Sequence, residues 1–183
     1  MRNGGPAFLA IAALATGCAT APERMSSDGC ADTISPAGVT CGFYQRCLEL
    51  RPVGLPTDEE QAALSPFLSE RLERLLEQAR ARQAEFGQQF PGEKPPLVDG
   101  SLFSSLFEGP TSFEVGPAVK RAGQDGVTRV PVSFRYGNEA AWQDVVLVKR
   151  EQDRNVIDDI EYGGAGEFNP PGRLSEALEQ SSD

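Results

Sequence analysis

The stretch Trp142-Gln143-Asp144-Val145-Val146-Leu147-Val148-Lys149-Arg150 decides the fold that we predict for this chain. Side chains alternate between the two faces of a strand, so the even-numbered residues from 142 to 148 share one face. Val145 and Leu147 make the opposite face apolar as well. A strand that is apolar on both faces is typical of the middle of a sheet with cover on both sides. We therefore predict a central, covered β-strand over residues 142–150.

The segments around this strand have the same two-residue period. Apolar residues alternate over 111–119, over 130–136 and over 156–162, and short turns separate the segments. Strands joined by short turns predict an antiparallel meander of about four strands. Pro131 lacks an N–H group and therefore suggests a bulge or an edge at that point.

The region before residue 111 shows helical periodicity instead. Apolar residues recur at helical spacing from 38 to 50 and predict a first helix. Thr57 followed by Glu60 forms a capping-box pattern, which predicts a short helix that runs to about residue 64. Ser65-Pro66 predicts the start of a long amphipathic helix to about residue 86.

Two shorter segments complete the predicted domain. Leu97 to Pro110 is expected to contain a short helical turn laid on the core, and Leu174 to Gln180 can form a last short helix. Helices first and strands after them define the α+β class, with N-terminal helices packed on the antiparallel sheet. We place a single domain at residues 36–166 and a C-terminal tail at 167–183.

The first residues have the layout of an export signal. Arg2 precedes an apolar run that is too short to span a bilayer, and Leu14-Ala15-Thr16-Gly17-Cys18 follows it. This ending resembles bacterial lipoprotein signals, although leucine is usual where Ala15 stands. The resemblance implies a signal peptide over 1–17, a lipid (palmitate) anchor on Cys18 and a tether over 18–35. The alternative is an ordinary secretory signal with a chance cysteine.

Composition excludes several classes of function. The sequence contains no histidine, which excludes Ser-His-Asp and Cys-His catalysis, histidine-ligated zinc and a histidine pH switch. The formal net charge of −10 argues against nucleic acid and anionic lipid as partners. The glycine-rich segment 163–166 lacks the spacing of a phosphate-binding loop, so we predict no nucleotide cofactor. We also predict no metal.

The cysteines predict one disulfide. Lipidation of Cys18 would leave Cys30, Cys41 and Cys47, and an oxidising compartment favours one pair among them. We predict Cys30–Cys41, with Cys47 buried as a small hydrophobic residue. The rival pairing is Cys30–Cys47.

Residues 67–164 resemble a family of exported bacterial lipoproteins that is classed as a domain of unknown function. The resemblance rests on the segment Leu97–Pro110, the strand at Trp142 and the run Asp158-Asp159-Ile160-Glu161-Tyr162-Gly163-Gly164. The layout is also similar to the nuclear-transport-factor-2-like (cystatin-like) superfamily. That likeness implies helices in the mouth of a curved sheet and a cone-shaped pocket. An alanine after Cys18 implies sorting to the periplasmic face of the outer membrane.

Two aspartates on neighbouring strands are the first candidates for a site. If the inner faces of 142–150 and 156–162 coincide, Asp144 and Asp158 enter a pocket together with Trp142 and Tyr162. Paired carboxylates in an apolar cleft could share a proton and perform acid–base chemistry. The structural alternative is that both aspartates cap turns or pair with arginines.

Residues of the 97–110 segment are the second group of candidates. Asp99 and Glu108 either cap the expected helical turn or line the mouth of the pocket, and Phe103 either packs in the core or lines the cavity. A calcium site formed by the acidic residues of 158–161 lacks the spacing of a liganding loop.

These observations lead to three hypotheses. The first is a non-enzymatic, lipid-anchored envelope domain that binds a small molecule or a peptide. The second is an immunity or inhibitor lipoprotein that blocks a toxic or lytic enzyme through its acidic surface. The third is an enzyme that uses carboxylates.

Overall fold

The computed structural model describes residue 1 and residues 25–26, 30, 32, 34–120, 126–164 and 171–180. The predicted signal peptide after residue 1, Cys18, most of the tether and residues 165–170 lie outside these residues. Within the described part of the chain, no helix has both the length and the apolar character that a membrane crossing requires.

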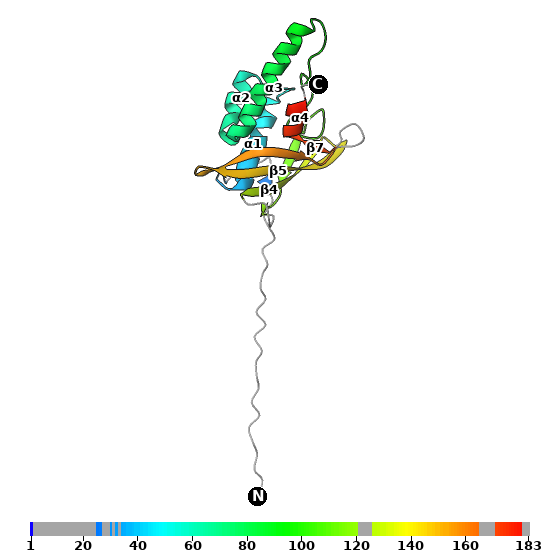
Figure 1. Cartoon of the computed structure of the whole chain (residues 1–183). Helices are drawn as coiled ribbons and strands as arrows, with labels where there is room; N and C mark the ends of the chain where they lie inside the picture. The colour runs from blue at the N-terminus through cyan, green and yellow to red at the C-terminus, as the bar shows by residue number, and fades with distance from the viewer. Residues whose placement is uncertain are drawn as a thin grey trace.

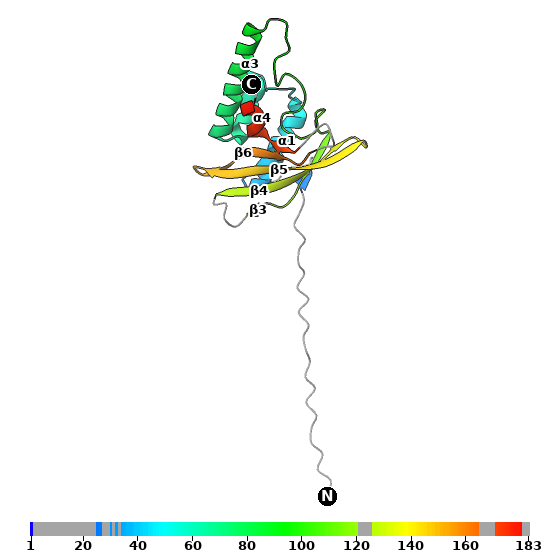
Figure 2. The same ribbon diagram turned by 45° about the vertical axis from the view of Figure 1, so that its right-hand side comes forward.

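The chain folds into one antiparallel sheet with helices on one side (Figures 1 and 2). The helices are α1 (Pro36–Leu50), α2 (Asp58–Leu64), the 3-10 turn η1 (Ser65–Phe67), α3 (Glu70–Gln89) and α4 (Leu174–Gln180). The strands are β1 (Met25–Ser26), β2 (Ser112–Val115), β3 (Val119–Lys120), β4 (Val127–Tyr136), β5 (Ala140–Glu151), β6 (Arg154–Tyr162) and β7 (Gly172–Arg173). The spatial order is β1-β2-β4-β5-β6-β7, and β3 also pairs with β4.

The α+β class and the meander of long strands are confirmed, but the sheet is larger than the predicted four strands. Among the described residues it has seven strands, because the two-residue strands β1, β3 and β7 add to its edges. The strand predicted over 111–119 is divided into β2 and β3. The break lies beside Pro131, whose carbonyl accepts the Gly116 N–H at 2.8 Å. Proline has no N–H to offer a partner strand, which explains the interruption.

Strand β5 is central, as predicted, and its even-numbered residues from Trp142 to Val148 are all buried beneath the helices. Every helix of the described residues lies on the same side of the sheet (Figure 2), so helices cover only one face of β5. On the other face Val145 is only partly buried, whereas Leu147 is buried without a helix over it. Branched side chains favour a pleated strand whether or not a second layer covers it, so the apolar run indicated position but not cover.

Helix α1 forms the centre of the helical layer and packs against five strands of the sheet, β1, β2, β4, β5 and β6. Its first turn is capped by the Ser35 hydroxyl, which accepts the Gly38 N–H at 3.1 Å, and Pro36 occupies a position that needs no donor. The rings of Phe43 and Tyr44 are buried, and Tyr44 meets Phe134 of β4 edge-on at 4.9 Å between ring centroids. Aromatic contacts of this geometry stabilise a core beyond the area that they bury.

The predicted disulfide is present between Cys30 and Cys41, with a Cα–Cα distance of 5.6 Å. Cys41 is fully buried, and the bond fixes the segment before α1 to the helix. Cys47 is free and only partly buried, where it packs against the core.

We expect one free thiol in a Cys18→Ser variant that is purified without reductant. Labelling of the denatured protein should modify Cys47 alone, because Cys30 and Cys41 are joined. Peptide mapping by mass spectrometry after alkylation measures this directly. Three labelled cysteines would contradict the disulfide, and a label on Cys41 would support the rival pairing of Cys30 with Cys47.

Helix α2 begins as predicted, but the long helix does not. Thr57 accepts the Glu60 N–H and Glu60 accepts the Thr57 N–H at 2.8 Å, which completes the capping box. Helix α3 begins after Ser69, four residues later than expected, because residues 65–67 form a separate 3-10 turn. Leu68 then becomes extended and pairs with Ile157 at the open edge of β6.

The segment 97–110 is a closed loop and not the predicted helical turn. Left-handed backbone angles at Leu97, Gly100 and Gly109 (φ 54°, 74° and 75°) interrupt a helix. The Ser101 N–H donates to the Phe107 carbonyl at 2.7 Å and closes the loop on itself. Its apolar residues Leu102, Phe103 and Leu106 still face the core, as expected. The last predicted helix is confirmed as α4.

Candidate functional site

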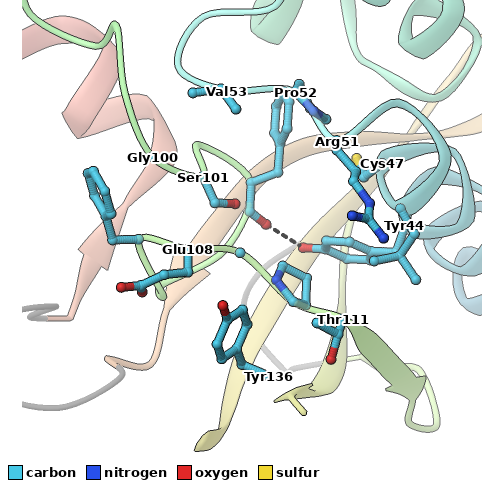
Figure 3. A pocket seen from close by; sticks show the side chains of 15 residues that line it. Tyr44, Cys47, Arg51, Pro52, Val53, Gly100, Ser101, Glu108, Thr111 and Tyr136 are labelled. Carbon is cyan, nitrogen blue, oxygen red and sulfur yellow. Dashed lines mark hydrogen bonds between the residues drawn. The ribbon is translucent and has the colours of Figure 1, made fainter. Parts of the chain in front are cut away.

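A pocket of about 480 Å³ lies where the end of α1, the loop over 97–111 and the end of β4 meet (Figure 3). Its lining is mainly apolar and aromatic. The principal contributors are Tyr44, Cys47, Phe103, Phe107, Pro110 and Tyr136. Pockets of this size and character, with a few polar groups, are typical of small-molecule sites.

Aromatic side chains that contact one another form the floor of the pocket. The Tyr44 hydroxyl donates to the Phe103 carbonyl at 3.0 Å, and the Phe103 ring meets the Phe43 ring edge-on at 5.3 Å. Burial, and then the charge of Asp144, raise the pKa of the Tyr44 hydroxyl well above its ordinary value. Partial burial also raises the pKa of the Cys47 thiol, which favours its protonated form at neutral pH.

The rim of the pocket carries one positive and one negative side chain. Arg51 ends α1 in the left-handed conformation (φ 51°, ψ 55°), and its N–H donates to the Cys47 carbonyl at 2.8 Å. Glu108 belongs to the loop across the pocket. Both side chains are exposed, and neither forms an ion pair within the described residues. Figure 3 shows them on opposite sides, with the Tyr136 hydroxyl directed between them.

Asp144 holds the loop wall of the pocket in place and is not itself a lining residue. Its carboxylate is fully buried and accepts the N–H groups of Ser105 and Gly163, each at 2.9 Å, and the Ser105 hydroxyl. The loop over 97–111 is thereby fixed to β5 and to the end of β6. These hydrogen bonds give Asp144 a structural role, although it pairs with no arginine among the described residues.

Asp158 lies apart from Asp144, so the proposed pair of carboxylates does not form. The register between β5 and β6 shifts at Leu147, which leaves Asp158 as an extra residue in a β-bulge. Its carboxylate accepts from the Ser69 hydroxyl at 2.7 Å and from the Lys149 ammonium at 2.7 Å. The bulge broke the alternation on which the prediction depended, and Asp158 instead anchors the start of α3.

We expect the Asp158 anchor to be lost in acid. Burial would raise the pKa of Asp158, but hydrogen bonds from Lys149 and Ser69 and the charges of Lys149 and Arg71 lower it below its ordinary value of 3.8. A depressed folded pKa contributes stability above the ordinary value, and this contribution disappears as the pH falls through the folded value.

Urea unfolding from about pH 6 to about pH 2 tests this expectation in the wild type and in Asp158→Asn. The difference in stability between the two proteins should be largest above about pH 4 and should narrow in stronger acid. Asp153→Asn is the control, because Asp153 is an exposed turn residue. A difference that stays constant over the whole range would contradict the role of Asp158.

The remaining predicted residues have structural positions. Tyr162 donates its hydroxyl to the Leu102 carbonyl at 2.5 Å, and Trp142 stacks on Phe134 with 5.4 Å between ring centroids. Asp99 caps no helix and pairs with Lys94. Of the seven pocket candidates, Phe103 and Glu108 line this pocket, whereas Asp99, Trp142, Asp144, Asp158 and Tyr162 do not.

The acidic residues considered for calcium have separate partners. Asp158 binds Lys149 and Ser69, Glu161 pairs with Arg129 and Arg173, and Asp159 accepts the Ser175 N–H at 3.0 Å at the start of α4. No group of three or more potential metal ligands was found in the described part of the chain.

Sequence reasoning missed Tyr44, Arg51 and Tyr136 as pocket residues. The helical spacing of Phe43 and Cys47 marked the buried side of α1, but it gave no sign that the end of α1 borders a cavity. Arg51 directly precedes Pro52, and a residue before proline favours an extended or turn conformation, which gives no sign of a binding site.

Comparison with protein-family models, with curated proteins and with solved structures finds no match. The resemblance to an exported lipoprotein family and to the cystatin-like layout therefore stays a prediction.

Proposed function

We propose that this protein is a non-enzymatic binding domain that takes a small, largely apolar molecule in the pocket between α1 and the loop over 97–111. The observation that carries the proposal is the pocket itself, about 480 Å³ in volume, with an aromatic floor and charged groups confined to the rim. An apolar group that fills such a cavity is stabilised by removal of its surface from water.

Binding without turnover fits the chemistry of the lining. The Cys47 thiol is held protonated, and Asp144 is occupied by hydrogen bonds outside the pocket. Glu108 is the acidic group at the pocket, and it stands at the exposed rim. A general base must be held in place by its neighbours, whereas Glu108 forms no ion pair or hydrogen bond among the described residues.

A fragment screen by protein-observed NMR tests the proposal. Small aromatic and branched apolar fragments should shift resonances of residues at the end of α1 and in the loop over 97–111. Phe107→Ala should weaken this binding, because Phe107 lines the pocket. Phe90→Ala is the matched control, since Phe90 is similarly exposed at the end of α3 and lies outside the lining. Fragments that bind both variants and the wild type equally would place the site elsewhere.

We further propose that the domain is anchored to the cell envelope through lipid on Cys18, on the periplasmic face of the outer membrane. The support is the signal-like layout of residues 1–18. A Cys18→Ser variant should leave the membrane fraction and appear as soluble protein. If the variant still fractionates with membranes, the anchor is wrong.

A protein partner is the second candidate, favoured by exposed apolar side chains beside the pocket. Val53 and Phe107 are 65% and 55% exposed and both belong to the rim, in a chain with a net charge of −10. A basic, secreted enzyme that inserts a side chain into the pocket fits this surface. A pull-down from the cell envelope with the Cys18→Ser protein should recover such an enzyme, and added Phe107→Ala should abolish the capture.

A further inference from the structure

We propose that the pocket selects a small zwitterion with an apolar side chain, of the amino-acid or dipeptide class. The inference rests on the proposed binding function and names its ligand. Three features of the rim and floor carry it: the position of Arg51, the position of Glu108 and the apolar floor between them.

Arg51 occupies a position that its own backbone disfavours. A residue with φ near 50° at the end of a helix is usually glycine or asparagine, and a longer side chain there costs about 1 kcal/mol. Its guanidinium pairs with no carboxylate of the described residues, whereas Arg46 on the same helix pairs with Glu49 at 2.7 Å. An arginine kept unpaired at the mouth of a pocket is suited to a carboxylate of a ligand.

Glu108 gives the rim the opposite charge on the opposite side. It also forms no ion pair within the described residues, and Arg51 and Glu108 do not pair with each other. A ligand with only a negative charge would gain from Arg51 but would be repelled by Glu108. A zwitterion satisfies both groups, because its ammonium can face Glu108 while its carboxylate faces Arg51 (Figure 3).

The floor determines the rest of the ligand. The Tyr44 hydroxyl and the Phe103 carbonyl are hydrogen-bonded to each other, and the two aromatic rings present an apolar surface to the pocket. The part of the ligand that enters deepest therefore carries no charge. The Tyr136 hydroxyl has no hydrogen bond within the described residues and points between the two charges, where it can bind a peptide or carboxylate oxygen. The volume of about 480 Å³ matches one or two residues.

Calorimetry with four probes tests this ligand class. The probes are the dipeptide leucylphenylalanine, its N-acetyl form, its C-terminal amide and the doubly blocked compound. We expect the zwitterion to bind tightest, and each single block to weaken binding by about five- to tenfold. Arg51→Gln should remove the penalty for the C-terminal amide, and Glu108→Gln should remove the penalty for the N-acetyl form.

Matched controls separate these effects from general charge. Arg46→Gln and Glu49→Gln change the same charges on the exposed surface of α1, outside the pocket, and should leave the order of the four probes unchanged. The penalties should also shrink as salt concentration rises.

The outcomes show separately whether the proposed ligand class or the proposed binding function is wrong. If the doubly blocked compound binds as tightly as the zwitterion, selection by charge is wrong while the apolar pocket stands. If none of the probes binds but apolar fragments still do, the ligand class is wrong and the binding function survives. If neither probes nor fragments bind, both fail.

Discussion

Replacement of Asp144 by asparagine should lower the free energy of unfolding by about 2–4 kcal/mol. The carboxylate accepts two backbone N–H groups and one hydroxyl in a fully buried position. An asparagine of the same shape keeps one acceptor oxygen and turns an NH₂ group toward a donor. At least one buried N–H then loses its partner, and an unsatisfied buried donor costs about 1–3 kcal/mol.

Urea unfolding at neutral pH measures this loss, and Asp153→Asn is the control. Asp153 is an exposed residue of the turn between β5 and β6, and its replacement should leave the urea midpoint unchanged. Asp144→Ala should be at least as damaging as the asparagine variant, because it leaves all three donors unpaired. If Asp144→Asn unfolds at the wild-type midpoint, the carboxylate is not the anchor that its hydrogen bonds indicate.

Asp144→Asn should also change the shape of the pocket. Ser105 is fixed by Asp144, and the residues on either side of it, Ser101, Phe103, Phe107 and Glu108, line the cavity. Asp144→Asn should therefore weaken fragment binding even under conditions in which the variant is fully folded. The effect would identify Asp144 as a positioning residue that acts through the loop.

The sequence predicted well what depends on local pattern. The alternation along β5 placed Asp144 and Trp142 on the buried face, and the capping box located the start of α2. The prediction put Asp158 on the wrong face because a β-bulge adds one residue to β6 and shifts the alternation of its side chains. No residue type at this point of the sequence indicates a bulge. The start of α3 was misplaced because Ser69, paired with a strand far along the chain, competes with Ser65 as a cap.

The pocket could not be predicted because it depends on contacts between distant segments. The Gly54 N–H donates to the Gly100 carbonyl at 2.8 Å and joins the connection after α1 to the loop over 97–111. Gly54 has a left-handed backbone (φ 66°), and a Cβ there would lie 2.4 Å from the Leu97 carbonyl oxygen. Sequence periodicity carries no information about a close contact between two distant segments. The sequence therefore could not show that Arg51 and Glu108 lie at the same pocket.

Three aspartates of the sheet share a role that composition alone does not reveal. Asp144 fixes the loop wall, Asp158 fixes the start of α3, and Asp159 fixes the start of α4 through Ser175. Each of these three carboxylates accepts hydrogen bonds from a segment that packs on the sheet, in addition to the other contacts of that segment. Hydrogen bonds to an ionised group are stronger than neutral ones, so three aspartates help to fix one loop and the starts of two helices on the sheet.

Phe103→Ala should be the second strongly destabilising change, with a loss of about 3–5 kcal/mol in the free energy of unfolding. Phe103 is only 3% exposed and meets Phe43 edge-on, so its removal leaves a cavity and deletes an aromatic contact. Phe107→Ala removes the same side chain from the same loop, but Phe107 is 55% exposed. We expect that variant to lose less than about 1 kcal/mol.

The pair of variants separates folding from binding at one pocket. Urea unfolding should rank Phe103→Ala far below Phe107→Ala, whereas fragment binding measured on folded protein should suffer in both. Equal stability losses would mean that Phe107 packs as a core residue and that the rim is closed. A stable Phe103→Ala protein would mean that the loop collapses into the space, and the pocket volume would then fall along with the affinity for apolar fragments. The expected result, a large loss at 103 and a small one at 107, requires a pocket with a rigid floor and an open mouth.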